Sequence, residues 1–361
     1  MQDVFAGTAA APSRPGTPAG PSEGPWLSVL IPAFNVQTYL EESVGSVLAQ
    51  ADADVEVLIV DDCSTDGTAD LMSSLAAADA RVRCLRHAQN QGVSVTRNTL
   101  LDHARGRYVW FLDADDYLAP GAIAQLRRII DEHAPSLLMC DYRMVREFPK
   151  LKHRLRGDPR KHTFEGPRRQ RITDASTIMA GTFRGGQMHP WSKIARRELW
   201  GTDLRFPPGR HFEDMHLLPF LALRAPDLWY EPAVWVIYRQ RQGSIMHTLN
   251  ARKADDLAWA MNGLREAVQA SGRHLDDQAA FAWANTLARN FIGAARMAQR
   301  FDPQRSAELI GGYRRQLEAA SPWSPDQLLK AYFRKGWWAR ALRLRYWLQR
   351  AAATGARSHS A

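Results

Sequence analysis

An apolar run that ends in three crowded carboxylates constrains this chain more than any other feature. Residues 107–118 have the sequence RYVWFLDADDYL, so a buried strand is followed at once by Asp113, Asp115 and Asp116. Carboxylates this close together repel one another and are costly to keep ionised unless a cation lies among them. A hard divalent ion meets that need, and open α/β sheets bind ligands beyond the carboxyl ends of their strands. The segment alone leaves a second interpretation open, an acidic turn before the helix expected at Pro120.

Strand and helix patterns alternate through the first 140 residues. Short apolar runs predict strands, and the segments between them carry apolar residues at helical spacing. The expected strands are 26–33, 55–60, 81–85, 108–112 and 136–140, and the expected helices are 38–49, one from 68, 93–103 and 120–132. This alternation predicts an α/β fold with a mostly parallel, doubly wound sheet.

The pattern changes after Tyr142. Residues 143–171 are basic and weakly periodic, which predicts a flexible excursion. A short helix near Ala175 and a strand at 233–238 are expected to follow. Helical patterning then extends from about 251 to 350, with breaks at Gly272, Asp302-Pro303 and 322–325.

Composition narrows the class of partner and the compartment. The chain has 47 Lys and Arg against 38 Asp and Glu, a net charge of +9 that favours anionic partners. Residues 1–25 are mostly Ala, Gly, Pro, Ser and Thr, which predicts a disordered leader rather than a secretory signal. The cysteines are few, odd in number and lack metal-type spacing, so a reduced, cytoplasmic protein is expected.

Several polar segments occur in a fixed order along the chain. They are Ser28–Asn35 (SVLIPAFN), Val60–Gly67 (VDDCSTDG), Asn90–Asn98 (NQGVSVTRN), Asp113–Asp116 (DADD), Trp191–Lys193 (WSK) and Glu213-Asp214. The set resembles the family 2 glycosyltransferases, which are inverting enzymes of GT-A (Rossmann-like) fold that use nucleotide-activated sugars. The resemblance covers roughly residues 26–248. Cys63 stands where the family more often has Gly.

The resemblance implies a nucleotide-sugar site at the strand ends. Pro32, Ala33 and Asn35 would lie against the nucleoside. Asp62 would accept from the imide N–H of a uracil, although an Asp here can also cap a turn. Arg97 would meet a ribose or diphosphate, or else form an ion pair that holds its helix to the sheet.

The resemblance also implies the groups that carry the reaction. Asp113 would approach the ribose and share with Asp115 a Mn²⁺ or Mg²⁺ ion that bridges the two phosphates, with His247 as a candidate third ligand. Asp214 would be the general base that takes the proton of the acceptor hydroxyl, with Glu213 as its neighbour. The alternative for this acidic pair is a stabilised helix N-terminus.

The W-x-K segment would border the donor sugar. Trp191 could stack on a sugar face, with Lys193 beside it, although a Trp is more often core packing.

The C-terminal residues combine Arg and Trp at helical spacing. A face made of Phe333, Trp337, Ala341, Leu344 and Leu348 could rest in an anionic membrane interface. The alternative is a terminal helix that packs on the rest of the protein.

We therefore expect a disordered leader (1–25), a GT-A catalytic domain (26–248) and a helical basic C-terminal region (249–361). The expected activity is inverting transfer of a hexosyl or N-acetylhexosaminyl group, most simply from a UDP-sugar, to a glycan or lipid-linked glycan of a surface polysaccharide, lipopolysaccharide or capsule. The protein would be cytoplasmic or peripheral on the inner membrane face, with no nucleic-acid partner. An inactive sugar-nucleotide-binding protein is the main alternative. A dehydrogenase is disfavoured because the first strand lacks a Gly-rich turn, and a phosphatase because the D-x-D follows the fourth strand.

Overall fold

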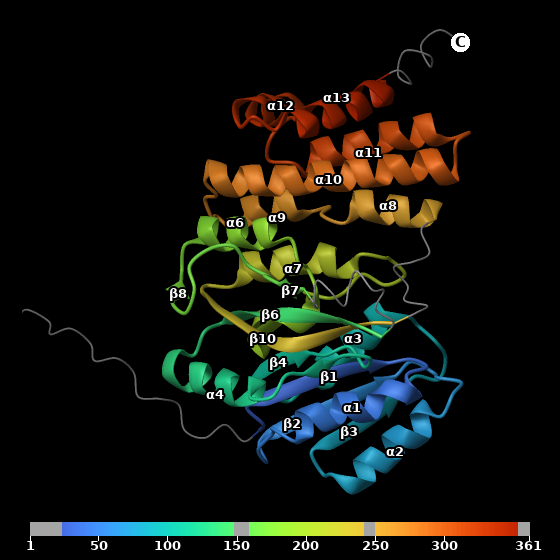
Figure 1. Ribbon diagram of the computed structural model, residues 1–361, viewed down its shortest axis with the longest axis vertical. Helices are drawn as coiled ribbons and strands as arrows, with labels where there is room; N and C mark the ends of the chain where they lie inside the picture. The colour runs from blue at the N-terminus through green and yellow to red at the C-terminus, as the bar shows by residue number, and fades with distance from the viewer. Residues whose placement is uncertain (1–23, 148–158, 242–249, 353–361) are drawn as a thin grey trace, which may run out of the picture.

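The computed structural model describes residues 24–147, 159–241 and 250–352. Figure 1 shows a central sheet with helices on both faces and a stack of C-terminal helices beyond α6 (Ala175–Gly185) and α7 (Glu213–Arg224). Across these described ranges, no helix is both long enough and apolar enough to cross a bilayer.

The five strands predicted before residue 141 begin within one residue of their predicted starts, among ten strands in the described residues. They are β1 (Leu27–Ala33), β2 (Val55–Asp61), β3 (Val82–Arg86), β4 (Tyr108–Phe111), β5 (Tyr117–Leu118), β6 (Leu137–Arg146), β7 (Arg160–Lys161), β8 (Arg171–Ile172), β9 (Lys193–Arg196) and β10 (Leu228–Gln240). Those with near-continuous burial are β1 and β2, which are rich in Val, Ile and Leu, and β4, which is mostly aromatic, as expected for strands covered on both faces.

The helices fill the segments between the strands and then the C-terminal region. In the sheet region they are α1 (Gln37–Leu48), α2 (Thr68–Ala78), α3 (Val93–His103), α4 (Ala122–His133), α6 (Ala175–Gly185) and α7 (Glu213–Arg224), with 3₁₀ turns η1 (Pro190–Ser192) and η2 (Arg197–Leu199). The C-terminal helices are α8 (Ala251–Trp259), α9 (Leu264–Ala270), α10 (Asp277–Phe301), α11 (Ser306–Ala320), α12 (Pro325–Arg334) and α13 (Trp338–Ala352).

The sheet is mostly parallel, as predicted. Its order is β3-β2-β1-β4-β9-β6-β10-β5, with β7 on β6 and β8 on β10. The pairs β3–β2, β2–β1, β1–β4 and β6–β10 are parallel, whereas β9 runs antiparallel between β4 and β6. The sequence analysis missed β9 because four residues, two of them charged, carry too little apolar pattern to signal a strand.

The prediction of a flexible excursion over residues 143–171 is wrong for the part that the structure describes. Strand β6 continues to Arg146, and β7 and β8 add short antiparallel pairs to the sheet. Strand β10 also begins earlier than predicted, at Leu228, and passes two irregularities in its register against β6. Three arginines of this segment pair with buried acids: Arg160 with Asp141, Arg169 with Glu231 and Arg171 with Asp227. Low hydrophobicity therefore did not mean absence of structure.

Two apolar cores lie on the two faces of the sheet. One face packs on α1 and α4 through residues such as Ile31, Trp110 and Ile123. The other core includes Phe111 on the sheet, passes through α6 and α7, and continues without a break to Leu344 in α13. The C-terminal helices therefore share one core with the sheet that carries the site.

The terminal helix packs on the protein with the face that was expected to meet a membrane. Ala341 and Leu344 are fully buried and Leu348 nearly so, with Phe333 and Trp337 packed partly against the same core. The prediction of a lipid-facing role for this face is therefore wrong, because α10, α11 and α12 cover it. The opposite face of α13 leaves Trp338, Leu342 and Tyr346 exposed.

Two leucines of α13 give a direct test of the shared core. Replacing the fully buried Leu344 by Ala should lower the free energy of unfolding by about 2–5 kcal/mol, because it leaves a cavity. The matched change Leu342→Ala, at a position 59% exposed, should have little effect. Urea unfolding followed by tryptophan fluorescence measures both. Equal effects of the two substitutions would contradict this packing.

Candidate active site

The predicted site residues gather at the carboxyl ends of the parallel strands. Strands β1, β2 and β4 end at Ala33, Asp61 and Phe111, next to the first turns of α3 and α7. Because parallel strands present their carboxyl ends on one side of the sheet, segments far apart in sequence meet there. His247 lies outside the described residues.

The loops after β1 and β2 are tied to each other. The backbone N–H of Asn35 donates to Ser64 Oγ at 2.9 Å, and the N–H of Thr65 donates to Asn35 Oδ1 at 2.9 Å. Asn35 has φ 52°, a left-handed conformation that an Asn tolerates better than most residues. Pro32 is half-buried and Ala33 buried, so this loop forms a fixed wall beside the strand ends. Its contact with a nucleoside stays a prediction.

Asp62 anchors the loop that leads into α3. Its Oδ1 lies 2.8 Å from His87 Nδ1 and accepts from the N–H of Gln91 at 2.9 Å, while Oδ2 accepts from the N–H of Gly92 at 2.7 Å. The side chain is almost fully buried. Each carboxylate oxygen can accept more than one hydrogen bond, so Asp62 keeps acceptor capacity for a nucleotide base. That contact stays a prediction.

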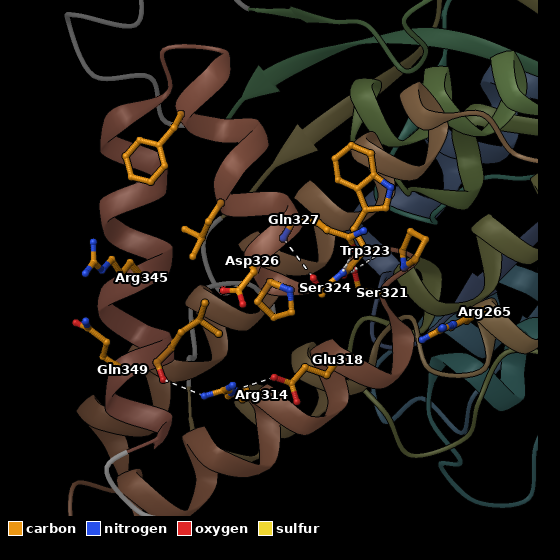
Figure 2. A pocket seen from close by; sticks show the side chains of 15 residues that line it. Arg265, Arg314, Glu318, Ser321, Trp323, Ser324, Asp326, Gln327, Arg345 and Gln349 are labelled. Carbon is orange, nitrogen blue, oxygen red and sulfur yellow. Dashed lines mark hydrogen bonds and ion pairs between the residues drawn. The ribbon is translucent and has the colours of Figure 1, made fainter.

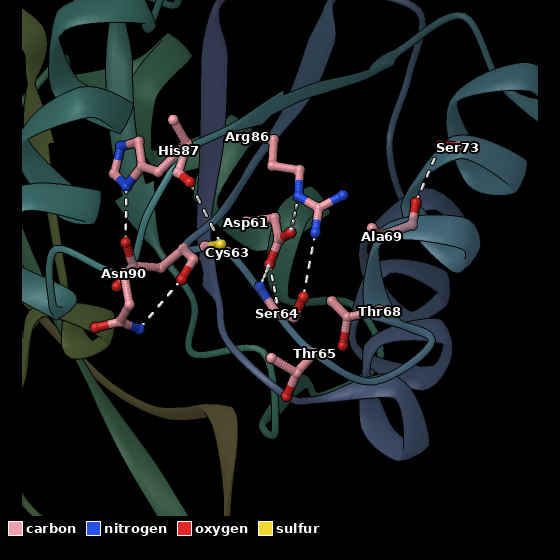
Figure 3. Close-up of polar contacts among 12 residues, drawn as sticks. Asp61, Cys63, Ser64, Thr65, Thr68, Ala69, Ser73, Arg86, His87 and Asn90 are labelled. Atoms are coloured by element: carbon pink, nitrogen blue, oxygen red, sulfur yellow. Dashed lines mark hydrogen bonds and ion pairs between the residues drawn. The ribbon is translucent and has the colours of Figure 1, made fainter.

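The turn after β2 holds its neighbours in a constrained geometry. Figure 3 shows Asp61 between Ser64 and Arg86: the Ser64 N–H donates to Oδ1 at 2.9 Å, and Arg86 Nε pairs with Oδ2 at 3.1 Å. Between them Cys63 has φ 62°, where a Gly costs least. A positive φ at this position explains why the family more often has Gly where this chain has Cys63. The strained backbone indicates that the shape of the turn is a functional constraint.

Arg97 joins the two acidic groups of the site. Its guanidinium donates to Glu213 Oε1 at 2.7 Å and to Asp113 Oδ1 at 3.1 Å, and it lies over the ring of Phe206. The side chain is only 7% exposed. Of the two interpretations of Arg97, the structure shows the ion pair. The pair with Glu213 joins residues that are 116 positions apart in sequence.

The D-x-D acids differ in their surroundings. Asp113 is partly exposed, whereas Asp115 pairs with Arg241 at 2.6 Å and Asp116 is buried. Asp116 accepts from the N–H of Arg239 at 2.8 Å, and its second oxygen has no partner among the described residues. Burial and then the charge of Asp113 raise the pKa of Asp115 and, more strongly, that of Asp116. The crowding predicted from the sequence is therefore a property of the folded site.

The donor atoms of this cluster fit a divalent cation. Carboxylate oxygens are what Mg²⁺ and Mn²⁺ prefer, and two carboxylates with substrate phosphates are a usual set for Mg²⁺. Within the described ranges no three His, Cys, Asp or Glu side chains gather as a complete metal site. Asp113 and Asp115 would thus need oxygen atoms from the substrate, and Arg241 would have to share or release Asp115.

Asp214 lies at the start of α7, beside Lys193 and His189. Burial raises the pKa of the Asp214 carboxyl, which accepts from the N–H of Met215 at 2.6 Å. Lys193 Nζ donates to the Gln187 carbonyl and to Ser192 Oγ, and burial lowers its pKa to about 7. Lys193 is 2% exposed, so its predicted contact with the donor sugar would need these bonds to rearrange.

Trp191 is buried, and other aromatic rings pack against its indole. It is 1% exposed, and its carbonyl accepts from Trp110 Nε1 at 2.8 Å. The imidazole of His189 stacks on the indole with centroids 4.7 Å apart. Trp191 is therefore a core residue in this structure. The solvent-accessible ring of the pair is that of His189.

Three side chains at the site had been given no role by sequence analysis: His189, Arg239 and Arg241. Arg239 and Arg241 surround the acidic cluster from the end of β10, through Asp115 and Asp116. His189 had no signal in the sequence, because its importance comes from what it stacks on.

A pocket of about 850 Å³ opens far from these strand ends, among the C-terminal helices (Figure 2). Its lining includes Arg265, Trp323 and Arg345, and its Glu318 is held by Arg314 at 2.8 Å. None of the predicted site residues that the structure describes lines it. Chemistry, rather than pocket size, therefore locates the active site.

A mostly parallel sheet with a D-x-D after the fourth strand and a second acidic pair across an arginine defines a GT-A glycosyltransferase. The sequence profile of glycosyl transferase family 2 matches residues 28–193. The chain is 30% identical over 175 residues to a Bacillus subtilis (strain 168) protein named as the teichuronic acid biosynthesis glycosyltransferase TuaG, covering 48% of the chain and 69% of TuaG. The chain belongs to glycosyltransferase family 2, which confirms the expected fold and enzyme class.

Other relatives extend the similarity without fixing a substrate. The succinoglycan biosynthesis protein ExoO of Rhizobium meliloti (strain 1021) is 28% identical over 68% of the chain and 72% of its own length. The chain spans 34% of EpsJ of Bacillus subtilis and of GlyA of Streptococcus pneumoniae. Residues 1–349 of S. aureus TarS, solved in complex with UDP-GlcNAc, match with a TM-score of 0.65 at 21% identity over 91% of each chain, which is a likeness of fold.

Removing the Arg97 bridge should expose how much the site depends on it. Arg97→Met leaves the largely buried Glu213 and the partly exposed Asp113 without their cation, and should lower the free energy of unfolding by about 3–5 kcal/mol at neutral pH. Arg97 holds the pKa of Glu213 and Asp214 down, so both pKa values rise in the variant. The deficit should therefore shrink as the pH falls and the acids are protonated.

Denaturant unfolding at several pH values measures this effect. Arg305→Met, which breaks the exposed pair Arg305–Glu308, is the control and should change stability little at any pH. A deficit for Arg97→Met that is independent of pH would contradict the electrostatic explanation.

Proposed function

We propose that this glycosyltransferase moves a hexosyl or N-acetylhexosaminyl group from a UDP-sugar to a hydroxyl of a surface glycan, with inversion. The observation that carries the proposal is the arrangement around Arg97: the D-x-D acid Asp113 on one side and the pair Glu213-Asp214 on the other. A displacement with inversion needs this separation, a group that receives the leaving phosphate and a base on the opposite side of the sugar carbon.

The donor side of the proposal rests on the loops after β1 and β2. Asn35 and Ser64 lock these loops together, and Asp62 lies at the end of β2 with acceptor capacity for an imide N–H. TarS, whose fold is similar, was solved with UDP-GlcNAc and with UDP. We assign Pro32, Ala33, Asn35 and Asp62 to the nucleoside, with uracil as the base.

Asp113 and Asp115 would hold Mn²⁺ or Mg²⁺ against the diphosphate. A bound ion would supply Lewis-acid stabilisation of the negative charge that develops on the departing nucleoside diphosphate. The residues themselves support this role, since burial and the charge of Asp113 raise the pKa of Asp115 and of Asp116, and a cationic Arg241 already pairs with Asp115. We further assign Arg239 and Arg241, which bond to Asp115 and Asp116, to the phosphate oxygens.

Asp214 would act as the general base. Burial raises the pKa of its carboxyl, which makes it a stronger proton acceptor than an exposed Asp, and Arg97 keeps that rise in check. The carboxylate must be ionised to work, so activity should be lost as the pH falls through this raised pKa. Glu213, held by Arg97 at 2.7 Å, fixes the first turn of α7 that carries Asp214.

For the acceptor we propose a growing glycan, free or lipid-linked, of a surface polysaccharide. The names of TuaG and ExoO connect those relatives with teichuronic acid and succinoglycan synthesis. We further propose that the protein is cytoplasmic and rests on the anionic inner face of the membrane, where lipid-linked acceptors are found.

The outer face of α13 is the surface that would make this contact. The described ranges contain six exposed large apolar side chains. Three of them, Trp338, Leu342 and Tyr346, lie four residues apart on the outer face of α13. Exposed Arg343 and Arg350 lie on the same helix, and residues 334–350 contain no acid. Aromatic and apolar side chains with flanking arginines suit an anionic lipid interface.

The decisive test of the activity is a panel of nucleotide sugars incubated with the purified full chain and Mn²⁺ or Mg²⁺. Release of free nucleotide should be strongest with one UDP-sugar, and chelation of the metal should reduce it. Asp214→Asn should lower transfer to an acceptor by at least about 100-fold, since it removes the base, while nucleotide affinity stays near wild type. Asp115→Asn should instead weaken the metal-dependent part of nucleotide binding.

Calorimetry and a coupled assay for released nucleotide separate these effects. Equal affinity for UDP with Mn²⁺ and with chelator would overturn the metal proposal. Full turnover by Asp214→Asn would overturn the assignment of the base. A panel with no nucleotide released would overturn the proposed activity.

Vesicle binding tests the membrane surface. The full chain should sediment with phosphatidylglycerol vesicles and much less with phosphatidylcholine vesicles. A variant with Ser at Trp338, Leu342 and Tyr346 should bind roughly ten-fold or more weakly, because three apolar side chains no longer enter the interface. Phe301→Ser, which removes an exposed apolar ring from the end of α10, should bind like wild type. Equal binding by the triple variant would contradict the proposal.

A further inference from the structure

A stack of nearly parallel rings lies beside Asp214. The imidazole of His189 and the indole of Trp191 are parallel to within 3°, and their centroids are 4.7 Å apart. Tyr238 is tilted by 18° or less from both rings, and Tyr142 meets Trp191 edge-on at 4.4 Å. The surrounding rings therefore fix the orientation of the imidazole, so it needs no hydrogen bond to hold its position.

Within the stack, the Trp191 ring is buried and the His189 ring is accessible. Trp191 is 1% exposed, whereas the side chain of His189 is 38% exposed. The backbone carbonyl of His189 accepts from Ser192 Oγ at 3.0 Å, which ties the residue to the η1 turn. The stack thus presents the imidazole of His189 to the site as a preformed planar surface.

The imidazole lies next to the proposed base without bonding to it. His189 Nδ1 is 3.7 Å from Asp214 Oδ2, longer than a hydrogen bond, and the ring makes no hydrogen bond to any other residue in the described ranges. Burial and then the charge of Lys193 lower the pKa of His189 to about 4, so the ring is uncharged at neutral pH. An uncharged flat ring suits the C–H face of a pyranose.

We propose that His189, lying flat on Trp191 beside Asp214, is an acceptor-binding residue whose ring supports the acceptor sugar. The inference rests on the proposed function, because it takes Asp214 as the base. The acceptor hydroxyl must reach that base, so the sugar that carries the hydroxyl lies within one ring of Asp214. The donor diphosphate is assigned to Asp113 and Asp115, which pair with Arg97 and Arg241. His189 Nδ1 comes within 3.7 Å of Asp214 Oδ2, so we assign its ring to the acceptor sugar.

The test compares a variant without a ring with one that keeps it. His189→Ala removes the platform, and His189→Phe keeps a flat ring without nitrogens. The control is His133→Ala, because His133 is also about 39% exposed and stacks on a buried tryptophan, Trp229, at 4.2 Å, but belongs to α4. A panel of p-nitrophenyl monosaccharide glycosides serves as acceptor probe, with the donor that wild type prefers.

We expect His189→Ala to raise the KM for the glycoside by about three- to ten-fold, with a smaller change in the KM for the donor. His189→Phe should restore most of the loss, and His133→Ala should match wild type. Thermal unfolding of each variant identifies any effect that comes from stability alone.

The other results overturn the inference. Unchanged acceptor KM in His189→Ala contradicts it, as does an equal loss in His189→Phe, which would mean that a ring nitrogen acts. Wild type that uses no glycoside of the panel also contradicts it, since the platform recognises the sugar ring itself. Failure of the proposed function is distinguishable from failure of this inference, because wild type would then release no nucleotide from any donor.

Discussion

The site depends on one electrostatic constraint: several acids must be kept close together and away from water. Three carboxylates follow β4, and two more begin α7. Arg97 offsets part of this repulsion by bonding to one acid of each group, and Arg241 offsets another part at Asp115. Because Arg97 is itself buried, its charge is screened little by water, so the two halves of the site are held at a fixed separation. Burial, and then the charge of Asp113, leaves Asp115 and Asp116 with raised pKa values.

The rest of the fold keeps this constraint in place. The parallel strands bring the acids to one end of the sheet, and α7 presents Glu213 and Asp214 from the opposite wall. Helix α7 packs on α6 and α9, whose core continues to α13. The C-terminal helices thus brace the helix that carries the proposed base, which gives them a role in the site although they contribute none of its predicted residues.

Sequence analysis predicted the elements whose physics is local. Strands such as 55–60 and helices such as 93–103 were recovered within a residue or two, because burial on both faces leaves a continuous apolar run and a helix repeats its apolar residues. Strand β9 was missed because its four residues draw their stability from two neighbours, β4 and β6. The basic segment after Tyr142 was misjudged for a related reason, since its arginines are ordered by acids that are distant in sequence.

By itself, the sequence determined the family, the fold class and which acids gather at the strand ends, because these follow from short motifs and from the geometry of parallel strands. Only the tertiary structure decided how those residues are used. It gave Arg97 two acidic partners, buried Trp191 beneath His189, committed Lys193 to Gln187 and Ser192, and turned the apolar face of α13 inward. The physical reason is that partner choice and burial depend on contacts between segments more than 100 residues apart, such as the 116 between Arg97 and Glu213, which no local pattern encodes.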